Sequence, residues 1–302
     1  MNNFFLLKKT IMKTFQPKLY IGTSGWSYKD WVPGFYPKQQ CADLNWLQFY
    51  SQYFNTIEVN STFYTYMNPK VIDVWISNTR HVDDFIFTIK LHSDFTHKRQ
   101  YTSEQVKAVR FNLDMLAREE RLGGILMQFP YSFDCTDANV EHVRKLAGEF
   151  AEYNKFLEVR HKSWHNKNAH SLTICTIDQP LIGEAIEFKP KAGNEIAYIR
   201  FHGRNEEAWK RSINSYGEKQ LYEQQSERYK YFYSPGELSE IERGIIEVYD
   251  KVKQVFVIMN NHPTGYAVAN AFELMHMLKG KYKVSMPDTI VKAFPRLKSI
   301  SA

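Results

Sequence analysis

Residues 196–202 read Ile-Ala-Tyr-Ile-Arg-Phe-His, a nearly continuous apolar run with one charged residue near its end. A run of this kind is typical of a β-strand buried on both faces, as in a parallel sheet covered by helices. The chain contains seven further runs of similar composition, which predict seven more strands. They are residues 19–23, 56–60, 85–91, 124–129, 156–160, 172–178 and 255–260.

Helical patterns lie between most of these runs. Asn68 followed by Pro69 predicts a helix start, because Asn caps helices and Pro suits their first turn. Residues 234–237 read Ser-Pro-Gly-Glu, a capping-box pattern, and the last predicted helix spans residues 266–278. Weaker helical patterns occur at residues 164–170 and 181–187.

Eight strands that alternate with helices predict one α/β domain, a (β/α)8 TIM-type barrel with long, aromatic-rich loops after its strands. We place the barrel at residues 18–286, after a flexible N-terminal extension (1–17) and before a C-terminal tail (287–302). An open doubly wound sheet is the alternative. The run Gly-Thr-Ser-Gly-Trp at 22–26 argues against it, because Trp does not suit a phosphate-binding helix start. Either Met1 or Met12 is the native start.

The composition is that of a globular protein that stays in solution. The 302 residues carry a net charge of +6, too weak a bias to indicate nucleic-acid binding by itself. No apolar run approaches the ~20 residues that cross a bilayer. The cysteines, Cys41, Cys135 and Cys175, form no paired motif, so we expect a cytoplasmic location.

Charged residues are embedded in four of the apolar runs. Glu58, Lys90, Glu158 and Arg200 each lie between two apolar neighbours, near the C-terminal end of a predicted strand. A lone ionised group is costly in a dry interior, so such residues are paired, exposed or functional. Side chains two positions apart share a face of a strand. The pairs are Glu58 with Asn60, Lys90 with His92, Glu158 with Arg160, and Arg200 with His202.

These residues are expected to meet at the carboxyl ends of the barrel strands, where TIM-type barrels place their active sites. Gln128, Asp178 and Asn260 occupy matching ends of other strands. A structural salt-bridge network that caps the core is the alternative interpretation of the same charges.

The sequence around these charges resembles the YecE-like family, domain-of-unknown-function family seventy-two. The matching segments are 22–28, 54–64, 128–130, 158–161, 198–204 and 260–262, with Trp31, 35–37, Lys90, 96–97, 163–164 and 265–267. The resemblance implies a barrel of the predicted type but no established activity. The similar shape of endonuclease IV and xylose isomerase barrels suggests DNA binding or hydrolysis by analogy only.

Arginine side chains near a helix N-terminus favour phosphate or carboxylate groups. We therefore predict an enzyme, hydrolase-like, that acts on a small anionic or phosphorylated substrate. The predicted catalytic residues are Glu58, Lys90, Glu158, Asp178 and His202. The predicted substrate-binding residues are Trp26, Asn60, Gln128, Arg160, Trp164, Arg200, Asn260 and Asn261.

Several alternatives stay open. We predict no cofactor; a divalent metal held by Glu58, Glu158, Asp178 and His202 is the alternative, which the nearby cations disfavour. A Schiff base at Lys90 is a further alternative, although a neighbouring Glu58 would keep this lysine charged. The other functions considered are a nucleic-acid-binding protein or phosphodiesterase, with Trp26 and Trp164 as stacking plates, and a non-enzymatic ligand-binding module. We predict no membrane partner, and the oligomeric state is left open.

Overall fold

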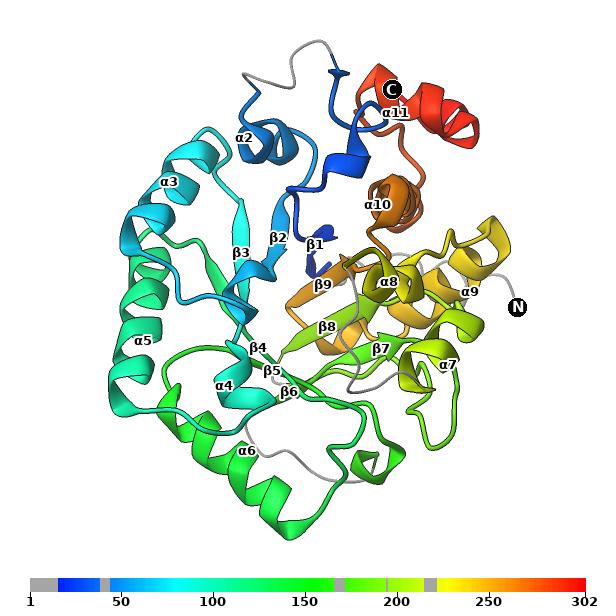
Figure 1. Cartoon of the computed structure of the whole chain (residues 1–302). Helices are drawn as coiled ribbons and strands as arrows, with labels where there is room; N and C mark the ends of the chain where they lie inside the picture. The colour runs from blue at the N-terminus through cyan, green and yellow to red at the C-terminus, as the bar shows by residue number, and fades with distance from the viewer. Residues whose placement is uncertain (1–15, 39–43, 166–171, 194, 215–221) are drawn as a thin grey trace, which may run out of the picture.

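The structure is a computed structural model of the chain and describes residues 16–38, 44–165, 172–193, 195–214 and 222–302. Nine strands in these residues form one parallel sheet, in the order β6-β5-β4-β3-β2-β1-β9-β8-β7. The sheet curves into a nearly closed barrel (Figure 1). Its two end strands, β6 and β7, must lie close together, because only Cys175 separates them in the chain. The strands are β1 (Lys18–Ser24), β2 (Thr56–Val59), β3 (Ile86–Lys90), β4 (Leu122–Gln128), β5 (Lys155–Glu158), β6 (Thr173–Ile174), β7 (Thr176–Asp178), β8 (Ile196–Phe201) and β9 (Gln254–Met259).

The predicted α/β barrel is confirmed, with one difference in strand count. The single strand predicted at 172–178 is divided at Cys175, because β6 pairs with β5 whereas β7 pairs with β8. Neighbouring barrel strands are staggered, so a short strand meets its two neighbours along different parts of its length. Nine strands therefore fill eight positions around the barrel.

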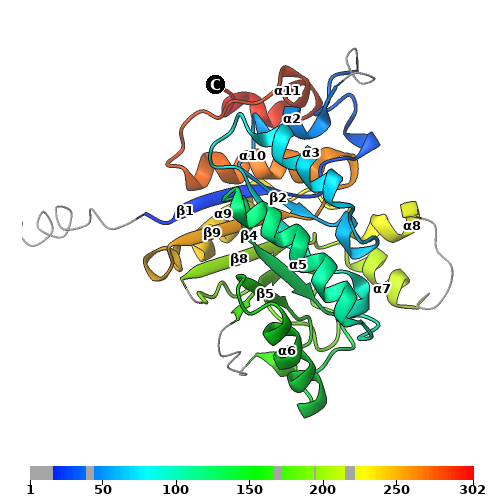
Figure 2. The ribbon, with the colours of Figure 1, turned by 90° about the vertical axis from the view of Figure 1, so that its left-hand side faces the viewer.

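Helices cover the outside of the sheet, and Figure 2 shows α3 and α5 packed along it. Asn68 caps α3 and Ser234 caps α9 with a full capping box, as predicted. The helix predicted at 181–187 was wrong, because these residues form a turn and one bridge. The α-helices are α2 (Trp46–Ser51), α3 (Pro69–Thr79), α4 (Ser93–Thr96), α5 (Ser103–Arg118), α6 (Asp137–Glu149), α7 (Glu206–Asn214), α8 (Tyr222–Ser226), α9 (Pro235–Ile246), α10 (Tyr266–Leu278) and α11 (Asp288–Ala293).

Short 3-10 helices occupy several of the connections. They are η1 (Lys29–Trp31), η3 (Ser61–Phe63), η4 (Lys162–Trp164), η5 (Glu227–Tyr229), η6 (Tyr249–Lys251), η7 (Pro263–Gly265) and η8 (Pro295–Ser299). Trp164, the first residue of the weaker helical pattern at 164–170, ends η4, and residues 166–170 of that pattern lie outside the described residues.

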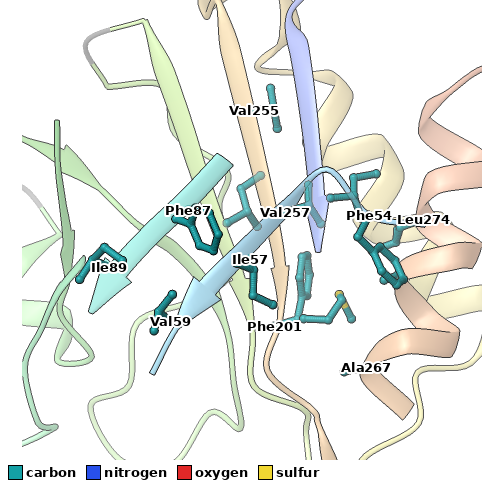
Figure 3. Packing of buried hydrophobic residues seen from close by; sticks show 14 of the residues in the cluster. Phe54, Ile57, Val59, Phe87, Ile89, Phe201, Val255, Val257, Ala267 and Leu274 are labelled. Atoms are coloured by element: carbon teal, nitrogen blue, oxygen red, sulfur yellow. The ribbon is translucent and has the colours of Figure 1, made fainter. Parts of the chain in front are cut away.

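The main core lies between the barrel and its helices. On β2, Ile57 and Val59 belong to this outer core, which also includes Phe54 and Leu274 (Figure 3). Alternation along the strand leaves Glu58 facing the barrel interior. Every residue of β2 is buried, although only one of its faces is apolar throughout.

A smaller aromatic cluster fills the inside of the barrel. The rings of Tyr20 and Phe256 stack at 4.6 Å, and those of Phe156 and Tyr198 stack at 4.1 Å. Two further pairs in this cluster, Tyr198 with Phe256 and Phe156 with Phe256, lie 5.6 and 5.8 Å apart. These four residues, here called the aromatic floor, close the barrel beneath the charged residues of the strands.

The C-terminal segment is folded onto the body of the protein. Ile290 of α11 and Leu297 of η8 are fully buried. Arg296 pairs with Glu273 of α10 at 2.7 Å. The segment predicted as a tail at 287–302 therefore packs against the barrel helices, whereas residues 1–15 of the predicted extension lie outside the described residues. Across the described ranges, none of the helices has the length and apolar character needed to cross a membrane.

We expect Phe256→Ala to lower the free energy of unfolding by about 3–5 kcal/mol, because the lost ring leaves a cavity in the aromatic floor. Urea unfolding followed by circular dichroism measures this change. Phe111→Ala is the matched control, since Phe111 is 53% exposed, and we expect it to change stability by less than about 0.5 kcal/mol. Similar effects of the two substitutions would contradict this description of the core.

Candidate functional site

Inward-facing side chains of the barrel strands lie in layers above the aromatic floor, because alternate residues share one face. In β8, Tyr198 belongs to the floor, Arg200 lies one layer above it, and His202 follows just beyond the strand. In β5, Phe156 and Glu158 follow the same order. The charged residues predicted to share a face therefore do so.

Arg200 joins two carboxylates inside the barrel. Its Nε donates to Glu58 Oε2 at 2.8 Å, and its Nη2 donates to Glu58 Oε1 at 2.6 Å. Its Nη1 donates to Glu158 Oε2. All three side chains are at most 1% exposed, so one guanidinium bridges residues of β2 and β5 away from solvent.

Both carboxylate oxygens of Glu58 are fully used as acceptors. The Tyr198 hydroxyl donates to Oε2 at 2.8 Å, and the Ser24 hydroxyl donates to Oε1. Asn60 in turn donates to the Ser24 hydroxyl, which orients that group. Glu58 is thus held as an acceptor by Arg200, Tyr198 and Ser24.

Glu158 is held in its ionised form. Arg160 donates to its Oε1 from Nε at 3.1 Å and from Nη2 at 2.8 Å. Burial would raise the pKa of this carboxyl, but the charges of Arg200 and Arg160 outweigh burial and hold the pKa well below its usual range. Neither Glu58 nor Glu158 is arranged as a proton donor.

His202 connects this charged layer to β9. Asn260 Nδ2 lies 2.9 Å from its Nδ1, and its Nε2 lies 3.3 Å from both Glu158 Oε1 and Arg160 Nη2. Burial lowers the pKa of His202 to about 3, although the Glu158 carboxylate opposes the shift. The imidazole is therefore neutral near pH 7.

A cavity of about 360 Å³ lies at the barrel mouth, the end of the barrel where the strands finish. Its outer wall includes Arg228 and Tyr229, which belong to the long segment after β8, and Figure 2 shows α7 and α8 of this segment at that end. Tyr28 and His262, stacked at 4.4 Å, form another part of the wall. The predicted site residues that line the cavity are Trp26, Asn60, Lys90, Gln128, Arg160, Arg200, His202 and Asn260.

Lys90, the last residue of β3, contributes an amine to this cavity. Its Nζ lies 4.2 Å from the centre of the Phe63 ring. Burial, together with the charge of Arg200, lowers the pKa of the Lys90 ammonium to about 7, although Glu158 and Glu58 oppose the shift. A substantial fraction of this amine is therefore neutral at physiological pH.

The charges around the cavity do not cancel. Arg200 and Arg160 match the two negative charges of Glu58 and Glu158. Arg228 adds a positive charge, Lys90 adds a second one only in its protonated form, and neither has a carboxylate within 4 Å among the described residues. The cavity therefore carries an excess of positive charge, which favours an anionic ligand.

Five predicted site residues do not line the cavity. Glu58 and Glu158 belong to the Arg200 bridge, and the other three have partners elsewhere. Asp178 does not line the cavity, because it pairs in register with Phe201 and faces the outer layer of the barrel. Arg204 holds its carboxylate there through Nε and Nη2, at 3.0 and 2.7 Å, and the Tyr233 hydroxyl also donates to it. Trp164 is buried and donates to the carbonyl of Phe133. The third, Asn261, donates to the carbonyl of Tyr231 and to Asn270. These bonds account for all three residues as structural contacts.

His92 also departs from the expected face. It lies beyond the end of β3, where it caps α4, contacts Asp94 at 3.1 Å and stacks on Tyr66. Sequence reasoning in turn missed Ser24 and Arg228. Alternation of side chains along β1 could have predicted that Ser24 faces the barrel interior, since it lies two positions after Gly22. No such alternation could have predicted the position of Arg228, because this residue lies outside any strand.

The residues of the metal alternative are spread over two charged groups. Glu58 and Glu158 contact Arg200, whereas Asp178 contacts Arg204. In the part of the chain that the structure describes, no three or more His, Cys, Asp and Glu side chains gather in a way that could hold a metal ion.

We expect Arg200→Met to lower the free energy of unfolding at pH 7 by about 3–5 kcal/mol, because it leaves two buried carboxylates without their shared cation. In the wild type, the depressed pKa of Glu158 gives stability that is present above the unfolded value of 4.5 and lost as the pH falls below it. In the variant, burial dominates and raises carboxyl pKa values, so stability should increase between pH 7 and pH 5. Urea unfolding at both pH values measures this difference.

The control for that experiment is Arg144→Met, which removes an exposed ion pair with Glu141 and should cost less than about 1 kcal/mol. Parallel pH dependence in the Arg200 variant and the wild type would show that the bridge does not hold the carboxylates ionised.

We expect Lys90→Met to raise the free energy of unfolding below pH 7 by about 1 kcal/mol or more. Folding lowers the pKa of Lys90 from 10.5 to about 7, so the cost of its charge is fully present below pH 7 and disappears as the pH approaches 10.5. Urea unfolding at pH 6 and pH 9 checks the sign, and the gain should be larger at pH 6. If Lys90→Met instead lowered the free energy of unfolding at both pH values, Lys90 would be shown to stabilise the fold.

Known proteins are similar to this chain over most of its length. The model of the protein family described as "Protein of unknown function DUF72" matches residues 20–293. UPF0759 protein YunF of Bacillus subtilis (strain 168) is 27% identical over 287 residues, which cover 89% of this chain and 98% of YunF. UPF0759 protein YecE of Escherichia coli (strain K12) is 28% identical over 158 residues, about half of each chain.

Solved structures agree. A DUF72 family protein from Thermotoga maritima has a TM-score of 0.72 and 30% identity, over 87% of this chain and 99% of that one. A DUF72 family protein from Enterococcus faecalis V583, 22% identical, has the same TM-score over 89% of this chain and 98% of its own, and supports the fold. With a barrel of this kind and a match from residue 20 to residue 293, the chain belongs to the DUF72 family, as its resemblance to YecE-like proteins predicted.

Proposed function

We propose that the cavity at the barrel mouth is the active site of an enzyme that acts on a small anionic or phosphorylated substrate. The observation that carries this proposal is the unmatched positive charge of Arg228 in the cavity, to which the protonated form of Lys90 adds. A structural network would need cations to match Glu58 and Glu158, and Arg200 and Arg160 already do so.

Arg228 is well suited to contact an anion. It lines the cavity, and its guanidinium lies 4.9 Å from the ring of Tyr229 and 5.6 Å from that of Trp209. Its Nη1 donates to Ser212, and its Nε has no hydrogen-bond partner among the described residues. Guanidinium groups stacked on aromatic rings keep their donor edges available for phosphate or carboxylate oxygens.

The size of the cavity supports a small substrate. Ligand sites in proteins have volumes of roughly 300–1,000 Å³, and this cavity lies near the lower limit. Aromatic residues Trp26, Tyr28 and Tyr229 contribute the apolar wall that such sites have. The nucleic-acid alternative used Trp26 and Trp164 as two stacking plates, but Trp164 is buried against Phe133, so that pair of plates is not formed.

Lys90 is the cavity residue best suited to move a proton. Glu58 and Glu158 are held by arginine, His202 stays neutral, and Asp178 belongs to another cluster. A general base is most effective when its pKa lies near the working pH, and the pKa of Lys90 is about 7. In a hydrolase-like reaction, the neutral amine takes the proton of the attacking water, while arginine holds the anionic group.

We expect inorganic phosphate to raise the melting temperature of the wild type, and Arg228→Gln to weaken phosphate binding by about tenfold or more, since one charged hydrogen bond contributes about 1.5–3 kcal/mol. Thermal shift titrations at constant ionic strength measure both effects. Arg144→Gln, an exposed arginine far from these contacts, is the control and should bind like the wild type. Equal phosphate affinity in all three proteins would refute the anion site.

A further inference from the structure

Lys90 is separated from the carboxylates that would otherwise neutralise it. Sequence reasoning expected Glu58 to keep this lysine charged and unreactive. Both Glu58 oxygens instead accept from Arg200, Tyr198 and Ser24. Among the described residues, Lys90 Nζ has no carboxylate within 4 Å, and its recorded contact is with the face of Phe63.

The surroundings of Lys90 favour an uncharged amine, chiefly because the amine is buried. Arg200 from β8 and Arg160 from the end of β5 oppose its positive charge, whereas Glu58 of β2 and Glu158 of β5 favour it. The ring of His97 packs edge-on to Phe63 at 4.8 Å, and burial lowers the pKa of His97 to about 4, so it adds no positive charge near pH 7. Burial decides the balance and lowers the pKa of Lys90 to about 7.

We propose that Lys90 is a covalent nucleophile that forms an imine with an aldehyde or ketone carrying a phosphate or carboxylate group. This inference rests on the proposed function, because Arg228 would hold the anionic group, but here the Lys90 amine attacks the substrate itself instead of taking a proton from water. It names both the substrate class and the reacting atom, the Nζ of Lys90.

The chemical step needs no further reactant. The lone pair of the neutral amine attacks the carbonyl carbon, a C–N bond forms as the C=O π bond breaks, and one N–H proton passes to the oxygen to give a carbinolamine. The hydroxyl takes a second proton from solvent and leaves as water when the C–O bond breaks. The second N–H proton then returns to solvent and gives the imine. A desolvated lysine beside another cationic group is a known way to activate an amine for this reaction.

The cavity has separate places for the two ends of such a substrate. Lys90 lies at the end of β3, whereas Arg228 enters from the segment after β8. The amides of Gln128 and Asn260 also line the cavity, and Asn260 keeps one hydrogen bond to His202. Amide groups at these positions can bind the oxygen that the carbonyl carbon carries during addition.

Reductive trapping with sodium cyanoborohydride tests the proposal. The probe is glyoxylate, a small aldehyde with a carboxylate, and the matched probe is acetaldehyde, which lacks the anionic group. Peptide mass spectrometry compares labelling of Lys90 with that of Lys70, an exposed lysine at the start of α3. We expect glyoxylate at pH 7 to label Lys90 at least ~10-fold faster than Lys70, because a lysine with an ordinary pKa is almost entirely protonated there.

Inorganic phosphate should slow the labelling of Lys90 and leave Lys70 unaffected. Lys90→Arg keeps a positive charge but cannot form an imine, so it should lose the labelled peptide while it still binds phosphate. Acetaldehyde should label Lys90 more slowly than glyoxylate does, if the anionic group is held in the cavity.

The outcomes separate this inference from the proposed function. If Lys90 is labelled no faster than Lys70, the nucleophile is refuted, and phosphate binding that depends on Arg228 would still support the anion site. If Lys90 is labelled rapidly by both aldehydes but phosphate neither binds nor protects, the amine is reactive and the anionic substrate class is refuted. Urea unfolding of Lys90→Arg verifies that loss of labelling does not come from loss of the fold.

Discussion

The bridge from Arg200 to Glu58 and Glu158 is the interaction on which the site depends. Three ionised groups at most 1% exposed would be very unfavourable if any one lacked its partners. Their geometry meets this requirement, because one guanidinium donates to both carboxylates and Arg160 supplies a second cation to Glu158. The same bonds remove both carboxylates from acid–base chemistry, so the bridge decides which residues above it can react.

The aromatic floor and the bridge act together. Phe156 and Tyr198 place apolar rings directly beneath the ionic layer, and the Tyr198 hydroxyl donates to Glu58. In such a dry environment, charges interact more strongly than they do in water. This explains why Lys90, one layer higher, has a lowered pKa although two carboxylates lie below it. The carboxylates are matched by arginine, whereas burial of the amine is not compensated.

Much of this arrangement could be predicted from the strands. Alternation of side chains places Glu58, Glu158 and Arg200 in one layer, and Asn60, Arg160 and His202 above them, as the sequence indicated. The prediction failed for Asp178, which pairs in register with Phe201 and therefore faces the outer layer, whereas Ile177 faces the interior beside Arg200. Arg204, in the loop that follows β8, binds the Asp178 carboxylate there. The prediction also failed for Trp164, which lies in a connection between strands and whose position depends on contacts with Phe133 rather than on periodicity.

The pairing of charges could not be predicted either, and it decides between the two interpretations of the site. A sequence shows which residues are charged but not which carboxylate each cation meets, so Glu58 was an equally plausible partner for Lys90. In the structure, a purely structural network accounts for Arg200, Arg160 and the two glutamates. It does not account for Lys90, which bears a cost of burial without an ion pair. It does not explain Arg228 either, which a long segment after β8 brings to the same cavity. Arg228 and the protonated form of Lys90 therefore have no negatively charged partner within the fold. A negatively charged ligand in the cavity would be that partner.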